Sequence, residues 1–246
     1  MERMGYDALN LGGPEFIFGK EFLEQTRSRV SFPYIASNLL YGGSRLPWTR
    51  EYVIKDVGGI KVAILGILDP DGLAQLPDRE QVKGLEVIPP EAALERLLLE
   101  VRGKADLVVL LSLFDAEKTF ALAKGIKGVD VAISSVSDDA FFLSPSQTGN
   151  TILLQVRPLG RLLGLLKITF DDQRAPRVSD RRIVSLGNSV PDHGEIARLV
   201  EKHKKIHETI QEKTKQQKQD KAQKELMEGL KLSPREFMER YRKELL

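Results

Sequence analysis

The spacing of apolar and polar residues along the first three quarters of the chain predicts strands that alternate with helices. Residues 51–56 alternate in polarity, a pair of glycines supplies a tight turn, and residues 60–68 are almost continuously apolar, which is typical of a hairpin entering a core. An apolar stripe at helical spacing follows Pro89 and Pro90. The same pattern predicts helices at 89–99 and 116–124 and strands at 106–112, 129–133, 151–156, 162–170 and 182–186.

Two successive strand–helix–strand steps indicate parallel pairing in the middle of the sheet. After residue 141 the helical pattern stops, and we expect the remaining strands to be antiparallel. Beyond Pro191 the composition shifts toward Lys, Glu and Gln. The sequence therefore predicts an α/β sandwich over residues 1–190 and a charged helical extension over residues 191–246.

The extension has its own pattern. Residues 213–219 carry no apolar side chain, so this stretch is expected to be solvated. Residues 233–236 fit a helix-capping box with proline at the first helical position, and Phe237, Tyr241 and Leu245 follow on one face. We expect these three side chains to dock on the core or on a partner.

Composition narrows the classes of function only slightly. The 246 residues are 41% hydrophobic and 29% charged, with a net charge of +2. This balance gives no electrostatic reason to expect nucleic acid as a partner. The absence of Cys excludes disulfides and thiolate metal sites, and no apolar run approaches the roughly 20 residues of a transmembrane helix.

Several segments carry a family resemblance through their order and spacing. Residues 4–12 lead into a Gly-Gly-Pro-Glu sequence, and residues 32–38 read as the strand that follows. Further segments of this kind lie at 52–59, 105–112, 128–131 and 149–171. Together they resemble the 5'-nucleotidase branch of the calcineurin-like metallophosphoesterases, which includes periplasmic nucleotide-sugar hydrolases. The resemblance implies a metallophosphoesterase fold and suggests a periplasmic setting, although the residues themselves leave the compartment open.

The resemblance also implies a site with two divalent metal ions, held by Asp, Asn and His, that activates a water to attack a phosphate ester. In this chain Gly13 stands where the family has a metal-binding Asn, and Pro14 stands where it has the His that assists the leaving group. Glu15 keeps the acidic end of that motif. Neither replacement can coordinate a metal or transfer a proton through its side chain.

Two other loops depart from the family in the same way. Ser112 is followed by Leu113 where the family has Ser-His, and Val136 stands in the degenerate Gly-His-x-His motif, where only Asp138 could still bind a metal. The two earliest motifs, Asp-x-His and Gly-Asp, would precede Met1. We therefore expect a domain that is incomplete at its N-terminus, with residues 9–11 at an exposed sheet edge.

Other polar groups have ordinary interpretations. Glu15, Asp115, Asp138 and Asp139 offer oxygen ligands for Mg²⁺ or Ca²⁺, but loop carboxylates explain them without a metal. His203 and His207 lie four residues apart on the predicted helix, a spacing at which both could bind one metal ion. Two solvated side chains are the simpler interpretation. Residues 69–72, Asp-Pro-Asp-Gly, have the composition of a turn.

The sequence favours a catalytically inactive 5'-nucleotidase-like module that acts by binding or as a structural part of a larger assembly. Such a module would have no catalytic residues and no cofactor. A protein partner would dock on the former active-site face or on the C-terminal helix. The alternative is a divalent-metal-dependent phosphoesterase, a phosphoric ester hydrolase, whose N-terminal metal motifs are missing from this sequence. An upstream reading frame that contains both motifs would favour the alternative.

Overall fold

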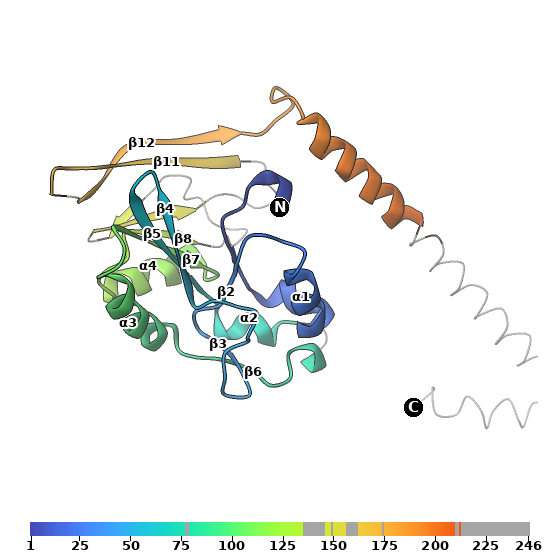
Figure 1. The fold of residues 1–246 in the computed structure, drawn as a ribbon, viewed down its shortest axis with the longest axis horizontal. Helices are drawn as coiled ribbons and strands as arrows, with labels where there is room; N and C mark the ends of the chain where they lie inside the picture. Colours follow the sequence, from blue (N-terminus) through green and yellow to red (C-terminus); the bar gives the residue numbers. More distant parts are fainter. Residues whose placement is uncertain are drawn as a thin grey trace, which may run out of the picture. The chain divides into compact units, whose positions relative to one another are not determined.

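The computed structural model describes residues 1–76, 79–134, 146–148, 150–155, 162–173, 175–209 and 212 (Figure 1). The chain divides into two compact units, Met1–Ser189 and Val190–Leu246. No helix among the described residues is both long and apolar enough to cross a membrane.

A six-stranded sheet forms the centre of the first unit, with the strand order β4-β5-β7-β8-β10-β9. The hairpin predicted from the alternating pattern is confirmed, because β4 and β5 are antiparallel, and β5, β7 and β8 are parallel neighbours as predicted. The strands are β4 (Tyr52–Val57), β5 (Ile60–Ile67), β7 (Leu107–Ser112), β8 (Val131–Ser134), β9 (Ser146–Thr148) and β10 (Thr151–Gln155).

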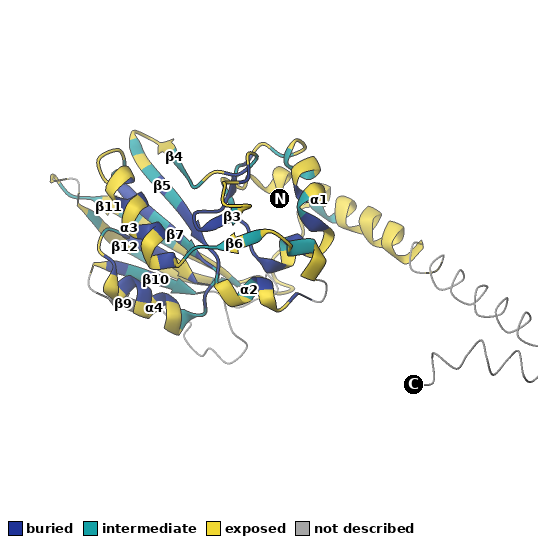
Figure 2. Ribbon diagram, turned by 90° about the horizontal axis from the view of Figure 1, so that it is seen from below, coloured by how far each residue is buried: buried dark blue, intermediate teal, exposed yellow. Residues whose placement is uncertain are grey.

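Two helices, α3 (Pro90–Val101) and α4 (Ala116–Gly125), pack on one face of this sheet (Figures 1 and 2). The face is apolar because every second residue of β5, from Ala63 to Ile67, points toward the helices. Leu94 and Leu97 of α3 are fully buried against it. The predicted apolar stripe after the two prolines is therefore the inner face of α3.

A second core lies beyond the carboxyl ends of the central strands. The exposed helix η1 (Glu2–Met4) precedes it in the chain. The short elements around this core are β1 (Leu9–Asn10), η2 (Gly13–Phe18), α1 (Gly19–Arg27), β2 (Tyr34–Ile35), β3 (Leu39–Tyr41), α2 (Pro70–Ala74), η3 (Arg79–Val82) and β6 (Leu85–Val87). Phe16 is completely buried in this core. Asn38 ties β3 to the segments after β5 and β6, since its amide nitrogen donates to the carbonyls of Leu68 and Ile88 and its Oδ1 accepts from the Leu68 amide.

Strand β1 has one sheet neighbour, because it pairs in parallel with β2 in a two-stranded sheet. Within the described residues its other edge has no strand partner, so residues 9–11 lie at an edge as expected. The edge is not exposed, however, because Asn10 and Leu11 are both buried. Residues 69–72 differ from the prediction of a simple turn. Asp69 caps the short helix α2 by accepting a hydrogen bond from the Asp71 amide, and Pro70 occupies the first helical position.

The last strands correct one expectation. The pattern predicts an antiparallel end after residue 141, but β10 is parallel to β8 and belongs to the central sheet. Only its pairing with β9 is antiparallel. Thr151 at the start of β10 donates its hydroxyl to the Val129 carbonyl, which holds the strand beside the segment leading into β8.

Strands β11 (Leu162–Phe170) and β12 (Pro176–Ser185) form an antiparallel hairpin that is a sheet of its own. Strand β12 begins six residues before the predicted 182–186 and is rich in Arg, Asp and Ser. Leu163 and Leu165 on β11 are 46% and 42% exposed, and Ile183 on β12 is 39% exposed. Apolar side chains on both faces of this hairpin are therefore only partly covered by the described residues.

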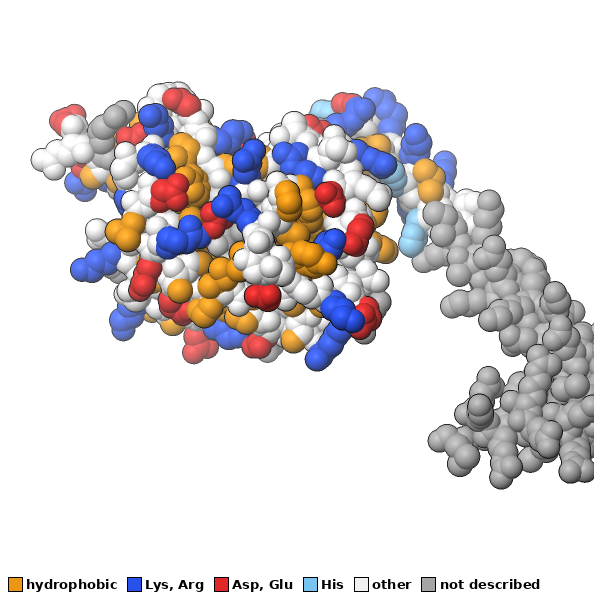
Figure 3. Space-filling model, turned by 60° about the horizontal axis from the view of Figure 1, so that its bottom comes forward, with side chains coloured by type: hydrophobic (Ala, Val, Ile, Leu, Met, Phe, Trp, Pro, Cys, Tyr) orange, Lys and Arg blue, Asp and Glu red, His pale blue; other side chains and the backbone are white. Residues whose placement is uncertain are grey.

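The surface carries charges of both signs. On the face that Figure 3 shows, Lys and Arg side chains are interspersed with Asp and Glu, and apolar side chains gather in several small patches between them. Neither sign dominates this face, in agreement with the net charge of +2 for the whole chain. The structure thus shows no extended field of one sign on this side of the first unit.

In the second unit, residues 194–209 are helical, as expected for the start of the extension. His203 and His207 are both exposed on this helix. The predicted docking residues Phe237, Tyr241 and Leu245 lie outside the described residues, and their docking stays a prediction.

Candidate functional site

The Gly-Gly-Pro-Glu sequence forms a tight turn at the carboxyl end of β1. Gly13 opens the helix η2, and Pro14 lies in its first turn, where a missing amide hydrogen costs nothing. The Glu15 carboxylate folds back and accepts a hydrogen bond from the Gly12 amide at 2.9 Å. The one acidic residue left in this motif therefore caps its own turn.

The position of Gly13 leaves no room for a side chain. A Cβ atom built on Gly13 would lie 2.3 Å from the Gly72 carbonyl oxygen, which belongs to the backbone of α2. Gly13 is also buried. Because backbone cannot move aside as a flexible side chain can, the space for a metal-binding Asn at this position is already filled.

The second predicted loop meets the first. Leu113, directly after β7, lies so close to Gly12 that a Cβ on Gly12 would be 2.7 Å from Leu113 Cδ1. The Leu113 amide donates to the Ile67 carbonyl, which extends the β5–β7 pairing by one residue. The structure thus brings Leu113 against Gly12, the chain neighbour of Gly13, and an isobutyl group stands where the resemblance implies an imidazole.

Ser112 faces away from this meeting point and into the core. It is 3% exposed, and its hydroxyl is 2.8 Å from the hydroxyl of Thr119 on α4. The Phe114 amide also donates to the Ser112 hydroxyl, at 3.4 Å. Ser112 therefore has a structural role in joining β7 to α4.

The third loop cannot be placed with the other two, because Val136, Asp138 and Asp139 lie outside the described residues. Asp115 is used elsewhere, since its carboxylate caps α4 by accepting from the Lys118 amide at 2.8 Å. Within the ranges that the structure describes, no three His, Asp or Glu side chains are grouped so that they could hold a metal ion. Of the four loop carboxylates Glu15, Asp115, Asp138 and Asp139, the two that are described, Glu15 and Asp115, accept hydrogen bonds from nearby backbone amides.

Asn10 is a buried polar residue that no motif in the sequence singles out. Its amide nitrogen donates to the carbonyls of Ile67 and Leu111, so that it ties β1 to the ends of β5 and β7. Its Oδ1 is buried without a hydrogen-bond partner among the described residues and lies against Gly66. The isolated glycine within the apolar strand 60–68 was the available signal of such a close approach.

The sequence and the fold resemble those of known proteins. No model of a known protein family matches the sequence. The chain is 28% identical over 228 residues to the uncharacterized metallophosphoesterase YunD of Bacillus subtilis, covering 89% of this chain and 47% of that protein. It is 28% identical over 111 residues to a 5'-nucleotidase of Vibrio cholerae, covering 44% of this chain and 20% of that protein.

Among solved structures, the 5'-nucleotidase precursor from Thermus thermophilus superposes with a TM-score of 0.63 at 23% identity, covering 76% of this chain and 39% of that chain. The chain is a relative of the metallophosphoesterases and 5'-nucleotidases. The resemblance carried by the short motifs is thereby confirmed, and so is the metallophosphoesterase fold. The chain spans less than half the length of each of these relatives.

Within this metallophosphoesterase fold, the turn after β1 and the end of β7 occupy neighbouring positions at one edge of the sheets. Leu113 offers no metal-binding atom there, and the Glu15 carboxylate already accepts a hydrogen bond from the Gly12 amide. The described part of the turn therefore holds one carboxylate, which is hydrogen-bonded within the turn, where the resemblance implies several metal ligands.

Proposed function

We propose that the chain is a non-catalytic 5'-nucleotidase-like metallophosphoesterase module, which acts by binding or as a structural part of a larger assembly. The observation that carries this proposal is the crowding at Gly13, where an added Cβ would lie 2.3 Å from the Gly72 carbonyl oxygen. A site that had lost one ligand would keep the space for it. Here the backbone of α2 takes up that space, and the side chain of Leu113 crowds the neighbouring Gly12.

The residues present do not fit a two-metal centre. Gly13, Pro14 and Leu113 offer no donor atom through their side chains, and Glu15 Oε2 already accepts from the Gly12 amide. Loss of metal ligands and of the groups that orient them lowers metal affinity at each step. We therefore assign no catalytic step to this chain and no metal ion to this site.

An activity assay tests the proposal. The purified chain is incubated with nucleotides, cyclic nucleotides or an aryl phosphate, each with Mn²⁺, Co²⁺, Zn²⁺ or Mg²⁺, beside an active 5'-nucleotidase as a positive control. We expect no metal-dependent release of phosphate, and none after Pro14→His. Turnover that disappears on Asp138→Ala, or calorimetric binding of two metal ions per chain, would overturn the proposal.

A second candidate function is favoured by a separate observation. The relatives bear the names metallophosphoesterase and 5'-nucleotidase, and the chain covers only 47% and 20% of two of them. A longer polypeptide that supplies Asp-x-His and Gly-Asp motifs would on this view be a metal-dependent phosphoesterase. Sequencing upstream of residue 1, followed by the same assay on the longer product, separates the two functions.

A partner-binding role is supported by exposed aromatic side chains that follow the turn of residues 12–15 in the chain. Helix η2 ends in Phe18, which is 71% exposed, and the rings of Phe18 and Phe22 are 5.2 Å apart. Exposed aromatic pairs are typical of protein interfaces. A photo-crosslinking residue at position 18 should capture one defined partner in cells, whereas the same residue at Leu99, which is 87% exposed on α3, should not. Equal labelling from both positions would argue against this face.

The compartment is part of the same proposal. The resemblance suggests a periplasmic or secreted module, and one solved relative is described as a precursor. Fractionation of source cells with an antibody against the chain tests this, and recovery in the cytosolic fraction alone would contradict it.

A further inference from the structure

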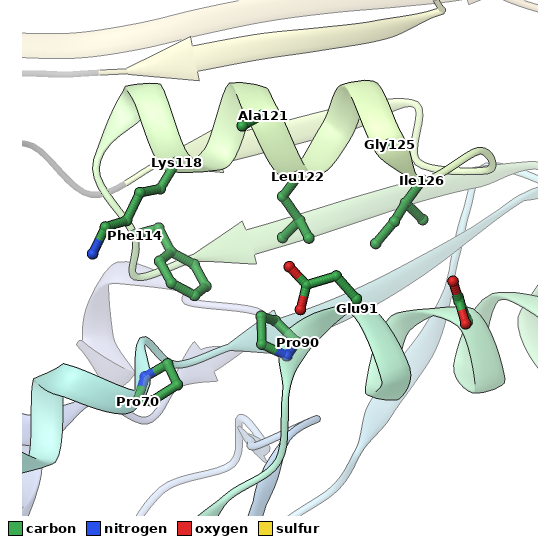
Figure 4. A pocket seen from close by; sticks show the side chains of 10 residues that line it. Pro70, Pro90, Glu91, Phe114, Lys118, Ala121, Leu122, Gly125 and Ile126 are labelled. Atoms are coloured by element: carbon green, nitrogen blue, oxygen red, sulfur yellow. The ribbon is translucent and has the colours of Figure 1, made fainter.

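A cavity of about 570 Å³ lies between α3 and α4, and none of residues 12–15 lines it (Figure 4). Its apolar surface comes from Pro90, Phe114, Leu122 and Ile126, whose side chains are otherwise buried. Leu113 turns toward Gly12, while the next residue, Phe114, turns toward this cavity. The volume falls within the roughly 300 to 1,000 Å³ that is usual for small-molecule sites.

Two carboxylates line the cavity from one helix. Glu91 and Glu95 line it from α3, one helical turn apart, and both are exposed. Neither carboxylate has an ion-pair partner among the described residues. Their negative charge is therefore available to a ligand that enters between the helices.

The cation at the cavity is already neutralised. Lys118 lines the cavity from α4, and its ammonium group is 2.9 Å from Asp69 Oδ2. The hydrogen bond to Asp69 raises the pKa of Lys118 above its ordinary value, and the nearby charge of Asp115 adds to this effect. Lys118 thus stays charged and paired, which leaves Glu91 and Glu95 to set the sign of the site.

We propose that this cavity binds a cationic ligand with an apolar body, that is, an ammonium or guanidinium group on an aromatic or aliphatic stem. The stem lies against Phe114, Leu122 and Ile126, and the cation lies at Glu91 and Glu95. The ligand is either a free organic amine or a Lys or Arg side chain presented beside an apolar residue of a polypeptide. This inference stands whether or not the chain hydrolyses phosphate esters.

The test is a titration of the ¹⁵N-labelled full chain followed by NMR. The probes are 2-phenylethylamine and phenylacetate, which have similar shapes and opposite charges. We expect phenylethylamine to shift the amide signals of Ala121 and Gly125, which line the cavity, and to bind at least about tenfold more tightly than phenylacetate. Equal affinity for the two probes, or shifts spread over the whole chain, would overturn the proposal.

Variants locate the binding. Gly125→Trp fills the cavity, and a Cβ there meets no atom within 4 Å, so the helix is expected to tolerate it. Gly103→Trp is the matched control, since its Cβ is equally unobstructed and it does not line the cavity. The first variant should abolish the shifts and the second should retain them. The proposal fails if Gly125→Trp keeps its native amide spectrum and still binds.

Charge variants complete the test. Glu91→Gln with Glu95→Gln should weaken phenylethylamine binding by about tenfold, whereas Glu117→Gln, on the exposed side of α4, should leave it unchanged. No effect of the double variant would contradict the assigned role of the carboxylates. An acetylated and amidated Phe-Lys dipeptide distinguishes a free organic amine from a polypeptide side chain as the ligand. Tighter binding than phenylethylamine assigns the cavity to polypeptide side chains, and weaker binding assigns it to a free amine.

Discussion

The crowding at Gly13 gives a sharp stability prediction. Gly13→Ala adds a single Cβ atom, which would lie 2.3 Å from the Gly72 carbonyl oxygen, more than 1 Å inside the 3.4 Å at which ordinary contact begins. Either α2 or the turn after β1 must therefore shift. Overpacking of this kind costs about 1 to 3 kcal/mol. For a domain of this size, a loss of about 2 kcal/mol lowers Tm by roughly 4 to 8 °C.

The assay is thermal unfolding of the full chain followed by circular dichroism, with two comparison variants. Gly103→Ala has open space around its Cβ and should leave Tm unchanged or raise it slightly. Gly12→Ala should fall between the two, because its nearest contact is the movable side-chain carbon Leu113 Cδ1, at 2.7 Å. Adding Leu113→Ala should relieve Gly12→Ala by about 1 kcal/mol but leave Gly13→Ala unrelieved. A Gly13→Ala chain as stable as the parent would refute the reasoning, and with it the claim that this position is filled.

Two further predictions concern polar contacts. Thr119→Val removes the hydroxyl that pairs with buried Ser112, so unfolding in urea should show a loss of about 1 to 3 kcal/mol, while Ser28→Ala, at an exposed hydroxyl, should change little. The hydrogen bond from the Ala175 amide and the contact with Arg177 hold the pKa of Asp171 below its ordinary value of 3.8. The ionised carboxylate therefore stabilises the end of the β11–β12 hairpin above pH 3.8, and this stabilisation is lost as the pH falls through the lowered pKa. The Ala175 amide signal should report that transition by NMR, and a midpoint above 3.8 would contradict it.

Much of the fold could be predicted from periodicity, because the central elements bury one face each. The stripe on α3 and the alternation on β4 arise directly from that burial. Strand β12 is longer than its pattern predicts, because its exposed Arg, Asp and Ser residues lack an apolar repeat. Helix α2 cannot be told from a turn by sequence, because Asp-Pro-x-Gly suits the first turn of a helix as well as an isolated turn.

The residue types at the candidate site could be read from the sequence. The resemblance assigned Gly13 and Leu113 to one site, and in the structure Leu113 lies against Gly12, next to Gly13 in the chain. What the sequence could not predict is the approach of Gly72 to Gly13, because two glycines far apart in sequence carry no periodic signal of contact. The role of Asn10 was hidden for a similar reason, since its partners are backbone carbonyls on two distant strands.

The partly uncovered hairpin of β11 and β12 affects how the chain behaves at high concentration. Its leucines would favour self-association by sheet stacking, and Arg177, Asp180 and Arg181 on β12 oppose this by charge repulsion and hydration. Salt screens charges at exposed edges, with a Debye length of about 8 Å at physiological ionic strength. Concentrated stocks of this protein should therefore keep best in low-salt buffer.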